Sequence, residues 1–349
     1  MRVIERFPAA TRPFEPVCSI CIANYNGSAL LDDCLASVLS QQGNINLEII
    51  VHDDASTDDS VKLLCEKYPQ VEVLASRQNV GFCVSNNRMV EHARGEFVLL
   101  LNNDAALFPD ALETLLSAAR AQKSMGILTL PQYEWDNGRL LDRGCLLDPF
   151  YNPVPNVDPR RSDVAMVIGA CLWIPRVLWN ELGGFPEWID SIGEDLYLCC
   201  HARLAGHAVR VLDHSGYRHR VGASFGGGKA QDDKLVTTFR RRALSERNKT
   251  FVMVMTCPSP VLQLWLPIHL TLMLIEGAML ALLRGQRAYL SQIYLPVFRA
   301  IFQNRRVLLK QRRTIMRRRS IGIRDFFAVF TLMPRKLSML LRHGLPLVK

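Results

Sequence analysis

The C-terminal part of the chain contains almost no acidic residues. Glu276 and Asp325 are the two acids in residues 251–349, against 16 Lys and Arg, so this part carries a net charge of +14. Residues 1–250 hold 26 Lys and Arg and 31 Asp and Glu, a net charge of −5. The overall charge of +9 is therefore the sum of two opposed parts. Such an asymmetry is typical of a basic surface that meets nucleic acid or anionic lipid.

Other absences exclude further classes of protein. The composition, 49% hydrophobic and 21% charged, is not that of a disordered, collagen-like or low-complexity chain. Residues 1–16 contain charges and prolines but no apolar run, so we expect no signal peptide and an active domain in the cytosol. The ten cysteines are scattered, and the C-x-x-C of Cys18 and Cys21 has no second pair at zinc spacing. Buried reduced thiols are therefore expected.

Two common phosphate-binding motifs are also missing. The first strand–helix turn reads NYNGS at residues 24–28, without the G-x-G-x-x-G of a dinucleotide site. The glycine-rich stretch at residues 226–230 lacks the first Gly of a P-loop at the required spacing and the Ser or Thr after its Lys. We therefore expect neither site, and we interpret the glycine-rich stretch as a mobile loop.

Short apolar runs alternate with helical patterns in the first third of the chain. This rhythm indicates an α/β fold built from βαβ units, with a mainly parallel central sheet flanked by helices. The ligands of such sheets bind beyond the carboxyl ends of the strands. We predict strands at residues 17–23, 47–51, 71–75 and 97–101, and helices at residues 29–40, 60–68, 84–93 and 109–121.

The middle of the chain shows weaker periodicity. Residues 125–165 carry many Pro, Asp and Arg and are expected to form an irregular segment that covers a cleft. Residues 164–174 are predicted to form a strand in which Gly169 permits a close approach by another group. Residues 191–204 are predicted to form a helix with an acidic first turn. The helix dipole favours acidic residues at this position, and a catalytic role would explain them equally well.

Polar clusters follow three of the predicted strands. Each cluster alone is also typical of turn residues and helix caps. Together, at successive strand ends, they are expected to converge on one crevice suited to a base, a ribose and a metal-bound diphosphate. The clusters are Asn24-Tyr25-Asn26, the DDASTD of residues 53–58, and Asn102-Asn103-Asp104.

With these clusters in their order, the chain resembles the inverting family 2 glycosyltransferases with a GT-A fold, among them rhamnosyltransferase-like enzymes of bacterial surface polysaccharides. The resemblance covers roughly residues 17–250. Its motifs are Ile22-Ala23-Asn24-Tyr25-Asn26, residues 53–58, Asn79-Val80-Gly81-Phe82 with Asn86-Asn87, Leu101-Asn102-Asn103-Asp104, Gly183-Gly184-Phe185, Glu194-Asp195-Leu196, and His219 before Ser224.

The resemblance implies a binding site for a nucleotide-sugar. Tyr25, Asp53 and Asp54 resemble the nucleoside pocket, in which a carboxylate accepts a hydrogen bond from the imide of a uracil or thymine ring. Asn87 resembles a contact to the donor sugar or its diphosphate, and Asn103 belongs to the same binding set. The resemblance thus favours a UDP- or dTDP-linked donor.

It also implies the catalytic groups. Asp104 and His219 resemble ligands of a divalent cation, Mg²⁺ or Mn²⁺, that bridges the two phosphates. Asp195 resembles the catalytic base, with Glu194 beside it in the same motif. The implied reaction is a single in-line displacement at the anomeric carbon, in which Asp195 accepts the proton of the acceptor hydroxyl.

Two positions depart from the family pattern. Asn102 stands where the family's D-x-D has its first acid, which predicts a lower metal affinity or metal contact through Asp104 and His219 alone. Ala55 stands where the family often has Gly, which predicts a tighter turn after the second strand.

The tail combines an apolar segment with a basic one. Residues 261–283 are long enough to cross a bilayer but are interrupted by Pro267, His269 and Glu276. Residues 284–319 hold eleven Lys and Arg and no acid among apolar residues, which predicts a pair of cationic amphipathic helices. Nucleic acid is a competing partner, but the apolar neighbour favours lipid. The positive-inside bias opposes a single span, so an interfacial or re-entrant helix is expected, with packing on the catalytic domain or a second subunit as the alternative.

We therefore predict a leader at residues 1–16, a GT-A domain at residues 17–250 and a basic helical tail at residues 251–349. The predicted function is sugar transfer to a lipid-linked or polysaccharide acceptor at the cytoplasmic face of the inner membrane. We expect residues 261–319 to contact the membrane, and we expect no nucleic acid to bind. A homo-oligomer is compatible with these expectations. The alternatives are a nucleotidyltransferase and an inactive membrane-bound nucleotide-binding scaffold.

Overall fold

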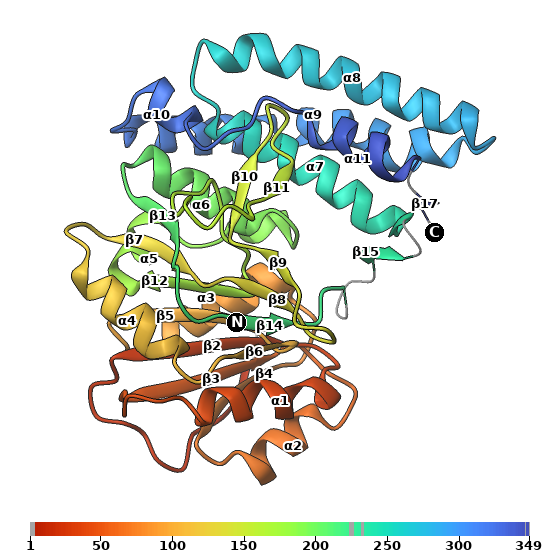
Figure 1. Cartoon of the computed structure of the whole chain (residues 1–349). Helices are drawn as coiled ribbons and strands as arrows, with labels where there is room; N and C mark the ends of the chain where they lie inside the picture. The colour runs from red at the N-terminus through yellow and green to blue at the C-terminus, as the bar shows by residue number, and fades with distance from the viewer. Residues whose placement is uncertain (1–3, 223–226, 232–233, 346, 349) are drawn as a thin grey trace.

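A computed structural model describes residues 4–345 and 347–348 of the chain, except residues 223–226 and 232–233. Its centre is an eight-stranded sheet with the strand order β1-β4-β3-β2-β5-β12-β7-β13 (Figure 1). Neighbours from β4 to β5 are parallel, as are β7 and β13, whereas β12 and β1 run antiparallel to their neighbours. The predicted α/β fold with a mainly parallel sheet is confirmed. The strands are β1 (Ile4–Phe7), β2 (Cys18–Asn24), β3 (Leu47–Asp53), β4 (Val71–Ser76), β5 (Phe97–Asn102), β7 (Gly126–Thr129), β12 (Cys171–Pro175) and β13 (Ala208–Val211).

Helices cover both faces of this sheet. In β2, Ile20 lies opposite Ile49 of β3 and Leu99 of β5, and all three belong to the core under α1, α2 and α4. Cys21 points the other way, into the core shared with α3, α5, α6 and α7. Burial on both faces explains why the central strands read as continuous apolar runs. The helices are α1 (Ser28–Leu39), α2 (Ser60–Lys67), α3 (Phe82–His92), α4 (Ala111–Ala121), α5 (Arg176–Leu182), the short 3₁₀ helix η1 (Glu187–Ile189), α6 (Glu194–Leu204) and α7 (Phe239–Thr256).

The cysteines are part of these cores. All ten are free, and nine are buried; Cys65, on α2, is exposed. The prediction of buried reduced thiols is therefore confirmed for every cysteine but Cys65.

The middle of the chain is more regular than its sequence predicts. Within residues 125–165, β10 and β11 form a hairpin, and β8 and β9 join β6 and β14 in a four-stranded sheet of order β6-β14-β8-β9. The prediction of an irregular segment is wrong because strands of three residues are too short to show an alternating pattern. These strands are β6 (Ala105–Leu107), β8 (Gln132–Glu134), β9 (Leu140–Asp142), β10 (Cys145–Leu147), β11 (Pro153–Pro155) and β14 (Tyr217–His219).

Two glycine predictions are also wrong. β12 begins at Cys171, so Gly169 precedes the strand, and a Cβ there would meet only the ring of Phe82 at 3.7 Å, an ordinary contact. The glycine-rich stretch forms β15 (Gly227–Gln231), which pairs with β16 (Lys234–Thr237), instead of a loop. Gly226, its first residue, lies outside the described residues. β17 (Leu347–Val348) completes this small sheet.

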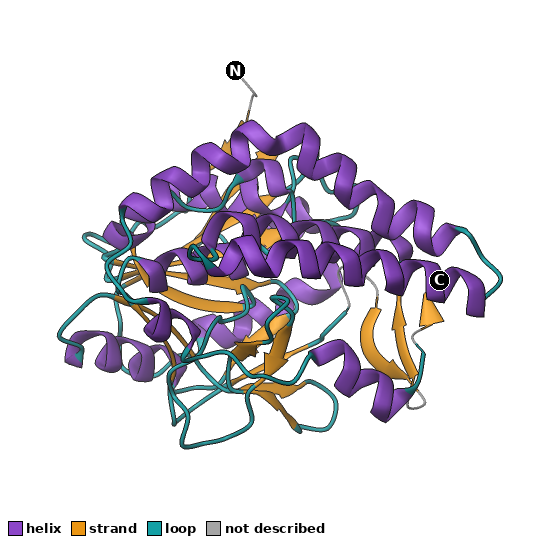
Figure 2. Cartoon of the chain, turned by 90° about the horizontal axis from the view of Figure 1, so that it is seen from above, coloured by secondary structure: helices purple, strands orange, loops and turns teal. Residues whose placement is uncertain are grey.

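The C-terminal helices form a layer over one side of the molecule, with α8 outermost (Figures 1 and 2). α7 packs against α9 and η2, and α8 packs against η2 and α7. The predicted pair of helices in residues 284–319 is wrong, because the π-helical turn η2 runs directly into α9; Pro296 is tolerated in the first turn of α9, where no backbone N–H is needed. The layer comprises α8 (Val261–Leu283), η2 (Tyr289–Tyr294), α9 (Leu295–Arg317), α10 (Ile323–Phe327) and α11 (Arg335–His343).

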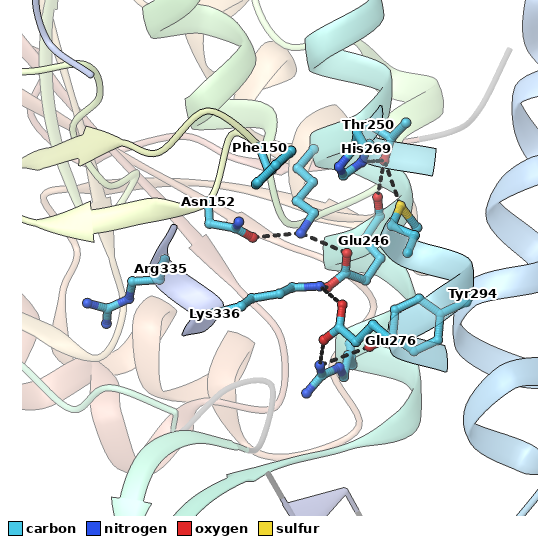
Figure 3. A network of polar contacts seen from close by, with 12 residues as sticks. Phe150, Asn152, Glu246, Thr250, His269, Glu276, Tyr294, Arg335 and Lys336 are labelled. Atoms are coloured by element: carbon cyan, nitrogen blue, oxygen red, sulfur yellow. Dashed lines mark hydrogen bonds and ion pairs between the residues drawn. The ribbon is translucent and has the colours of Figure 1, made fainter. Parts of the chain in front are cut away.

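A buried network of charges ties this layer together (Figure 3). Glu246 of α7 accepts from Lys249 Nζ at 2.7 Å and from Lys336 Nζ of α11 at 2.6 Å. Glu276 of α8 accepts from the same Lys336 at 2.5 Å and from Arg242 of α7 at 2.7 Å. Two carboxylates and three cations therefore join α7, α8 and α11.

The two faces of α8 differ in their surroundings. Its inner face bears Glu276 and His269, whose Nε2 is hydrogen-bonded to Thr250 Oγ1 of α7 at 2.8 Å. Burial lowers the pKa of His269 to about 3, so the imidazole is neutral at physiological pH. The polar residues that interrupt the apolar sequence thus point toward the protein. The outer face is an exposed apolar stripe, the α8 stripe, of Leu264, Ile268, Leu272, Ile275, Met279 and Leu282.

By length and composition, α8 is long and apolar enough to cross a membrane, and no second described helix is. Of its most apolar window of 18 residues, 22% are buried, so α8 is not a core helix.

Candidate active site

The carboxyl ends of β2, β3 and β5 bring together polar residues that are far apart in the sequence. Asn24 donates from Nδ2 to Asp53 Oδ2 at 3.0 Å and accepts at Oδ1 from Asn103 Nδ2 at 2.8 Å. This chain of hydrogen bonds crosses three neighbouring strands because parallel strands end at the same edge. The three predicted polar clusters therefore meet at one edge of the sheet.

Gly27 lies directly against these hydrogen bonds. A Cβ at this position would lie 2.4 Å from Asn24 Oδ1 and 2.2 Å from Asn103 Nδ2. Any side chain would therefore separate the two amides. Sequence reasoning did not assign Gly27 to the site, although a small residue in the first strand–helix turn was visible.

The turn after β3 is fixed by its two aspartates. Asp53 accepts from Ser56 N at 2.9 Å and from Ser56 Oγ at 2.6 Å, and Ala55 between them has a φ of 64°. Asp54 accepts from Val80 N at 2.6 Å and Gly81 N at 2.8 Å. Burial raises the pKa of Asp54, and these two N–H groups oppose that shift.

These hydrogen bonds fix the conformation of the predicted nucleoside pocket. Asp53 and Asp54 are buried, whereas Tyr25 is 54% exposed at the rim. Tyr25 is thus free to contact a ligand, and the contacts of all three residues to a base stay predictions.

The side-chain amide of Asn87 bonds the backbone of another segment. Its Nδ2 donates to Phe185 O at 2.8 Å, and its Oδ1 accepts from Phe185 N at 2.9 Å. The side chain therefore joins α3 to the turn at residues 183–185. Since both ends of the amide are bonded to backbone, its contact to a donor sugar or diphosphate stays a prediction.

Asp104 and His219 lie side by side although 115 positions separate them. Asp104 directly precedes β6, and His219 of β14 pairs with Ala105, the first residue of β6. His219 Nε2 lies 3.1 Å from Asp104 Oδ1, and the two side chains are 9% and 3% exposed. A carboxylate oxygen and an imidazole nitrogen at this separation fit two adjacent ligand positions of a divalent cation.

Asp104 and His219 alone do not complete the coordination of a divalent cation. Among the described residues, no group of three or more His, Cys, Asp or Glu side chains could hold a metal ion. Magnesium-type sites that bind through substrate phosphates use one or two carboxylates in this way. The residues present therefore fit a cation that is shared with a diphosphate.

Glu194 and Asp195 form the first turn of α6. Asp195 accepts from Gly169 N at 3.2 Å and from Leu196 N at 2.7 Å. Burial raises the pKa of both carboxyl groups, and the neighbouring charge of Asp195 raises that of Glu194 further. Oε2 of Glu194 is buried without a hydrogen-bond partner. A carboxylate with a raised pKa is a stronger proton acceptor, as a general base requires.

The backbone that leads into this turn is strained. Asp190 and Ile192 have φ values of 74° and 66°, which are unfavourable for side chains other than Gly. Asn248 of α7 holds this segment, because its Nδ2 donates to Ser191 O and Ile192 O, each at 2.8 Å. Asn248 is fully buried. An Asn inside a helix gives no sequence signal for such a role, and Asn248 was not predicted.

Comparison with solved structures identifies the fold. The crystal structure of GalNAc-T7 with UDP, GalNAc and Mn²⁺ matches 78% of this chain and 59% of that chain, with a TM-score of 0.53 at 14% identity. The sheet and the site at its strand ends define a GT-A fold, as the sequence resemblance implied.

Sequence comparison finds similarity to glycosyltransferases over part of the chain. Residues 19–182 match the family model of Glycosyl transferase family 2. Chondroitin synthase of Escherichia coli is 32% identical over 199 residues, which are 56% of this chain and 28% of that protein. Poly(ribitol-phosphate) beta-glucosyltransferase of Bacillus spizizenii is 30% identical over 209 residues, 58% and 32% of the two chains. The chain thus spans about a third or less of the length of these relatives.

Proposed function

We propose that the chain transfers a sugar from a nucleoside-diphospho-sugar to a hydroxyl of a lipid-linked or polysaccharide acceptor, with inversion at the anomeric carbon. The observation that carries the proposal is the pairing of Asp104 with His219 at the sheet edge where Asn24, Asp53 and Asn103 meet. The names of the two curated relatives, a chondroitin synthase and a poly(ribitol-phosphate) glucosyltransferase, support a polymeric acceptor.

Asp195 is the base in this proposal. Its carboxylate takes the proton of the acceptor hydroxyl while that oxygen attacks the anomeric carbon and the nucleoside diphosphate departs from the opposite face. The hydrogen bonds from Gly169 and Leu196 fix the carboxylate, and its raised pKa favours taking up the proton. Glu194 is buried beside it, and burial together with the neighbouring charge of Asp195 raises the pKa of Glu194 as well.

Asp104 and His219 would hold Mg²⁺ or Mn²⁺ against the donor diphosphate. When bound, the cation neutralises the charge that grows on the departing diphosphate. The GalNAc-T7 structure contains both UDP and Mn²⁺, which supports this proposal. Asn102 adds no charge at this position, so two protein ligands carry the site.

Binding of the donor is tested by thermal stability. We expect UDP or dTDP at about 100 times its Kd to stabilise the protein by about 2.7 kcal/mol, because a ligand bound only by the folded state raises its stability. GDP at the same concentration should stabilise it less. Tyr25→Ala should reduce this shift without changing the melting temperature of the free protein, since Tyr25 is exposed. Phe14→Ala, at an 84% exposed aromatic residue, is the matched control and should leave the shift unchanged. A protein that none of the three nucleotides stabilises would contradict the proposed function.

Metal dependence is tested by chelation and by direct binding. Excess EDTA should abolish turnover at saturating donor, and Mn²⁺ should restore it. Asp104→Asn and His219→Gln should weaken Mn²⁺ binding in the presence of UDP, measured by calorimetry, by about 10–100-fold or more. Asp213→Asn, at an exposed carboxylate, should leave the affinity unchanged. Unchanged turnover in EDTA would remove the metal from the mechanism.

We also propose that the protein works at the cytoplasmic face of the inner membrane, with residues 261–319 on the lipid. The α8 stripe offers an apolar surface along the outer face of α8, which is the outermost helix of the C-terminal layer (Figure 1). Since Glu276 and His269 fix the inner face of α8 to α7, the helix is suited to lie on the membrane rather than to cross it. This arrangement places the basic residues of α9 close to lipid headgroups.

A further inference from the structure

A basic cavity lies where the C-terminal half of α9 meets the turn between α7 and α8. Its volume is about 410 Å³. The lining has three guanidinium groups, two apolar side chains and a hydroxyl, and no acid: Ser259, Leu309, Arg312, Arg313, Met316 and Arg319.

One of the three guanidinium groups is fixed by the fold. Arg312 donates from Nη1 to Val254 O at 3.0 Å and to Cys257 O at 2.6 Å, at the C-terminal end of α7. Its Nη2 donates to Ser259 Oγ at 2.9 Å. Arg312 therefore gives the cavity a rigid positive wall, because these acceptors hold the guanidinium without neutralising it.

The other two guanidinium groups are available for a ligand. Neither Arg313 nor Arg319 makes a side-chain hydrogen bond or ion pair with any residue that the structure describes. A cluster of uncompensated positive charges in a concave site calls for an anion, and guanidinium groups bind phosphate oxygens in paired hydrogen bonds.

The surroundings indicate an anion attached to an apolar chain. Leu309 lines the cavity and is 50% exposed, and Met316 lies in the same wall. Ser259 is two residues before the start of α8, so the cavity lies at the beginning of the α8 stripe. Nucleic acid would not use this apolar rim, whereas a phospholipid presents a phosphate beside acyl chains.

We propose that this cavity binds the phosphate headgroup of an anionic membrane lipid and so fixes how the protein is oriented on the membrane. The proposal rests on the proposed membrane association. Arg313 and Arg319 bind the phosphate, Arg312 supports them, and Leu309 and Met316 meet the first part of the acyl chains. The α8 stripe then lies along the apolar side of the same lipid surface.

The test uses the full chain and vesicles of phosphatidylcholine, with or without phosphatidylglycerol. The variant Arg313→Gln/Arg319→Gln removes two charges inside the cavity. The control Arg305→Gln/Arg306→Gln removes two charges from exposed positions on the same helix, outside the cavity lining. We expect affinity for phosphatidylglycerol vesicles to fall about tenfold further in the cavity variant than in the control, because only the cavity residues converge on one phosphate. Equal losses in both variants indicate diffuse attraction alone and would overturn the proposal.

Two further experiments distinguish a lipid phosphate from a soluble phosphate, and the proposed cavity site from the proposed membrane association. Glycerol 3-phosphate should compete with the vesicles only weakly; competition as strong as that of lipid would assign the cavity to a soluble phosphate and overturn the lipid site. Leu272→Ser/Ile275→Ser, in the α8 stripe, should weaken binding to both kinds of vesicle. If this stripe variant loses binding and the cavity variant does not, membrane association stands and the phosphate site fails. If the unaltered chain binds no vesicle, the membrane association fails while nucleotide binding is untouched.

Discussion

Asp195→Asn should lower kcat by about 10²–10⁴-fold while the affinity for the donor nucleotide stays close to that of the unaltered protein. Asn retains the size of the side chain, and its carbonyl oxygen can still accept from Gly169 or Leu196. It cannot take up a proton at neutral pH. The variant therefore separates a lost base from a lost fold, and it separates an enzyme from an inactive nucleotide-binding scaffold.

The pH dependence gives a second readout of the same residue. Because burial raises the pKa of Asp195, the carboxylate form appears at higher pH than for an exposed Asp. We expect kcat/KM to rise with pH through this raised pKa and then to level off, and Asp195→Asn to lose this rise. Asp59→Asn, at an exposed N-cap without a side-chain hydrogen bond, should behave as the unaltered protein. A normal rate in Asp195→Asn would show that another group is the base.

Glu246→Ala should destabilise the protein by about 3–5 kcal/mol, because removing one partner of a buried ion pair leaves buried charge without compensation. The side chain of Glu246 is 4% exposed and that of Lys249 is 5% exposed. Without Glu246, Lys249 loses its ion-pair partner and Lys336 keeps only Glu276. Urea denaturation at neutral pH measures the loss.

The expected loss depends on pH in a defined direction. Burial lowers the pKa of Lys249 to about 8 even beside Glu246, and it should fall further in the variant. The unfolded chain then binds more protons than the folded one up to the ordinary pKa of Lys, so the stability of the variant should rise with pH in this range. Asp33→Ala removes an exposed partner of Arg220 and should leave the denaturation midpoint nearly unchanged. Equal small effects in both variants would mean that the buried network contributes no more than a surface pair.

The sheet and its flanking helices were predictable because their patterns are long. The strand from Cys18 to Asn24 is a nearly continuous apolar run, and the helix from Ser28 to Leu39 repeats its apolar residues at helical spacing. The strands of three residues in the middle of the chain have no such length, and the pairing of Tyr217 with Leu107 depends on a contact across more than a hundred residues. Hydrophobic periodicity does not report contacts of this kind.

The meeting of the polar residues was predictable where they lie at the carboxyl ends of strands or directly after them. Asn24, Asp53 and Asn103 meet because the topology of parallel strands places their ends together. Asn248 and Gly27 could not be predicted from the sequence. Asn248 acts by donating hydrogen bonds to backbone carbonyls of a distant segment, and Gly27 acts because it has no side chain. Asn87 lies within a recognisable motif, but the motif did not predict that its side-chain amide would bond the backbone of Phe185.

Helix α7 limits where the chain can be shortened without disturbing the proposed site. Asn248 bonds the segment before Asp195, and two residues earlier Glu246 bonds α11, whose Lys336 bonds α8. The helix that steadies the proposed base is therefore itself steadied by the outer helices. The predicted division at residue 250 cuts through this helix, which ends at Thr256. A chain shortened there would lose the last residues of α7 and the outer helices that hold it, so low activity in such a fragment would not show that the activity needs a membrane.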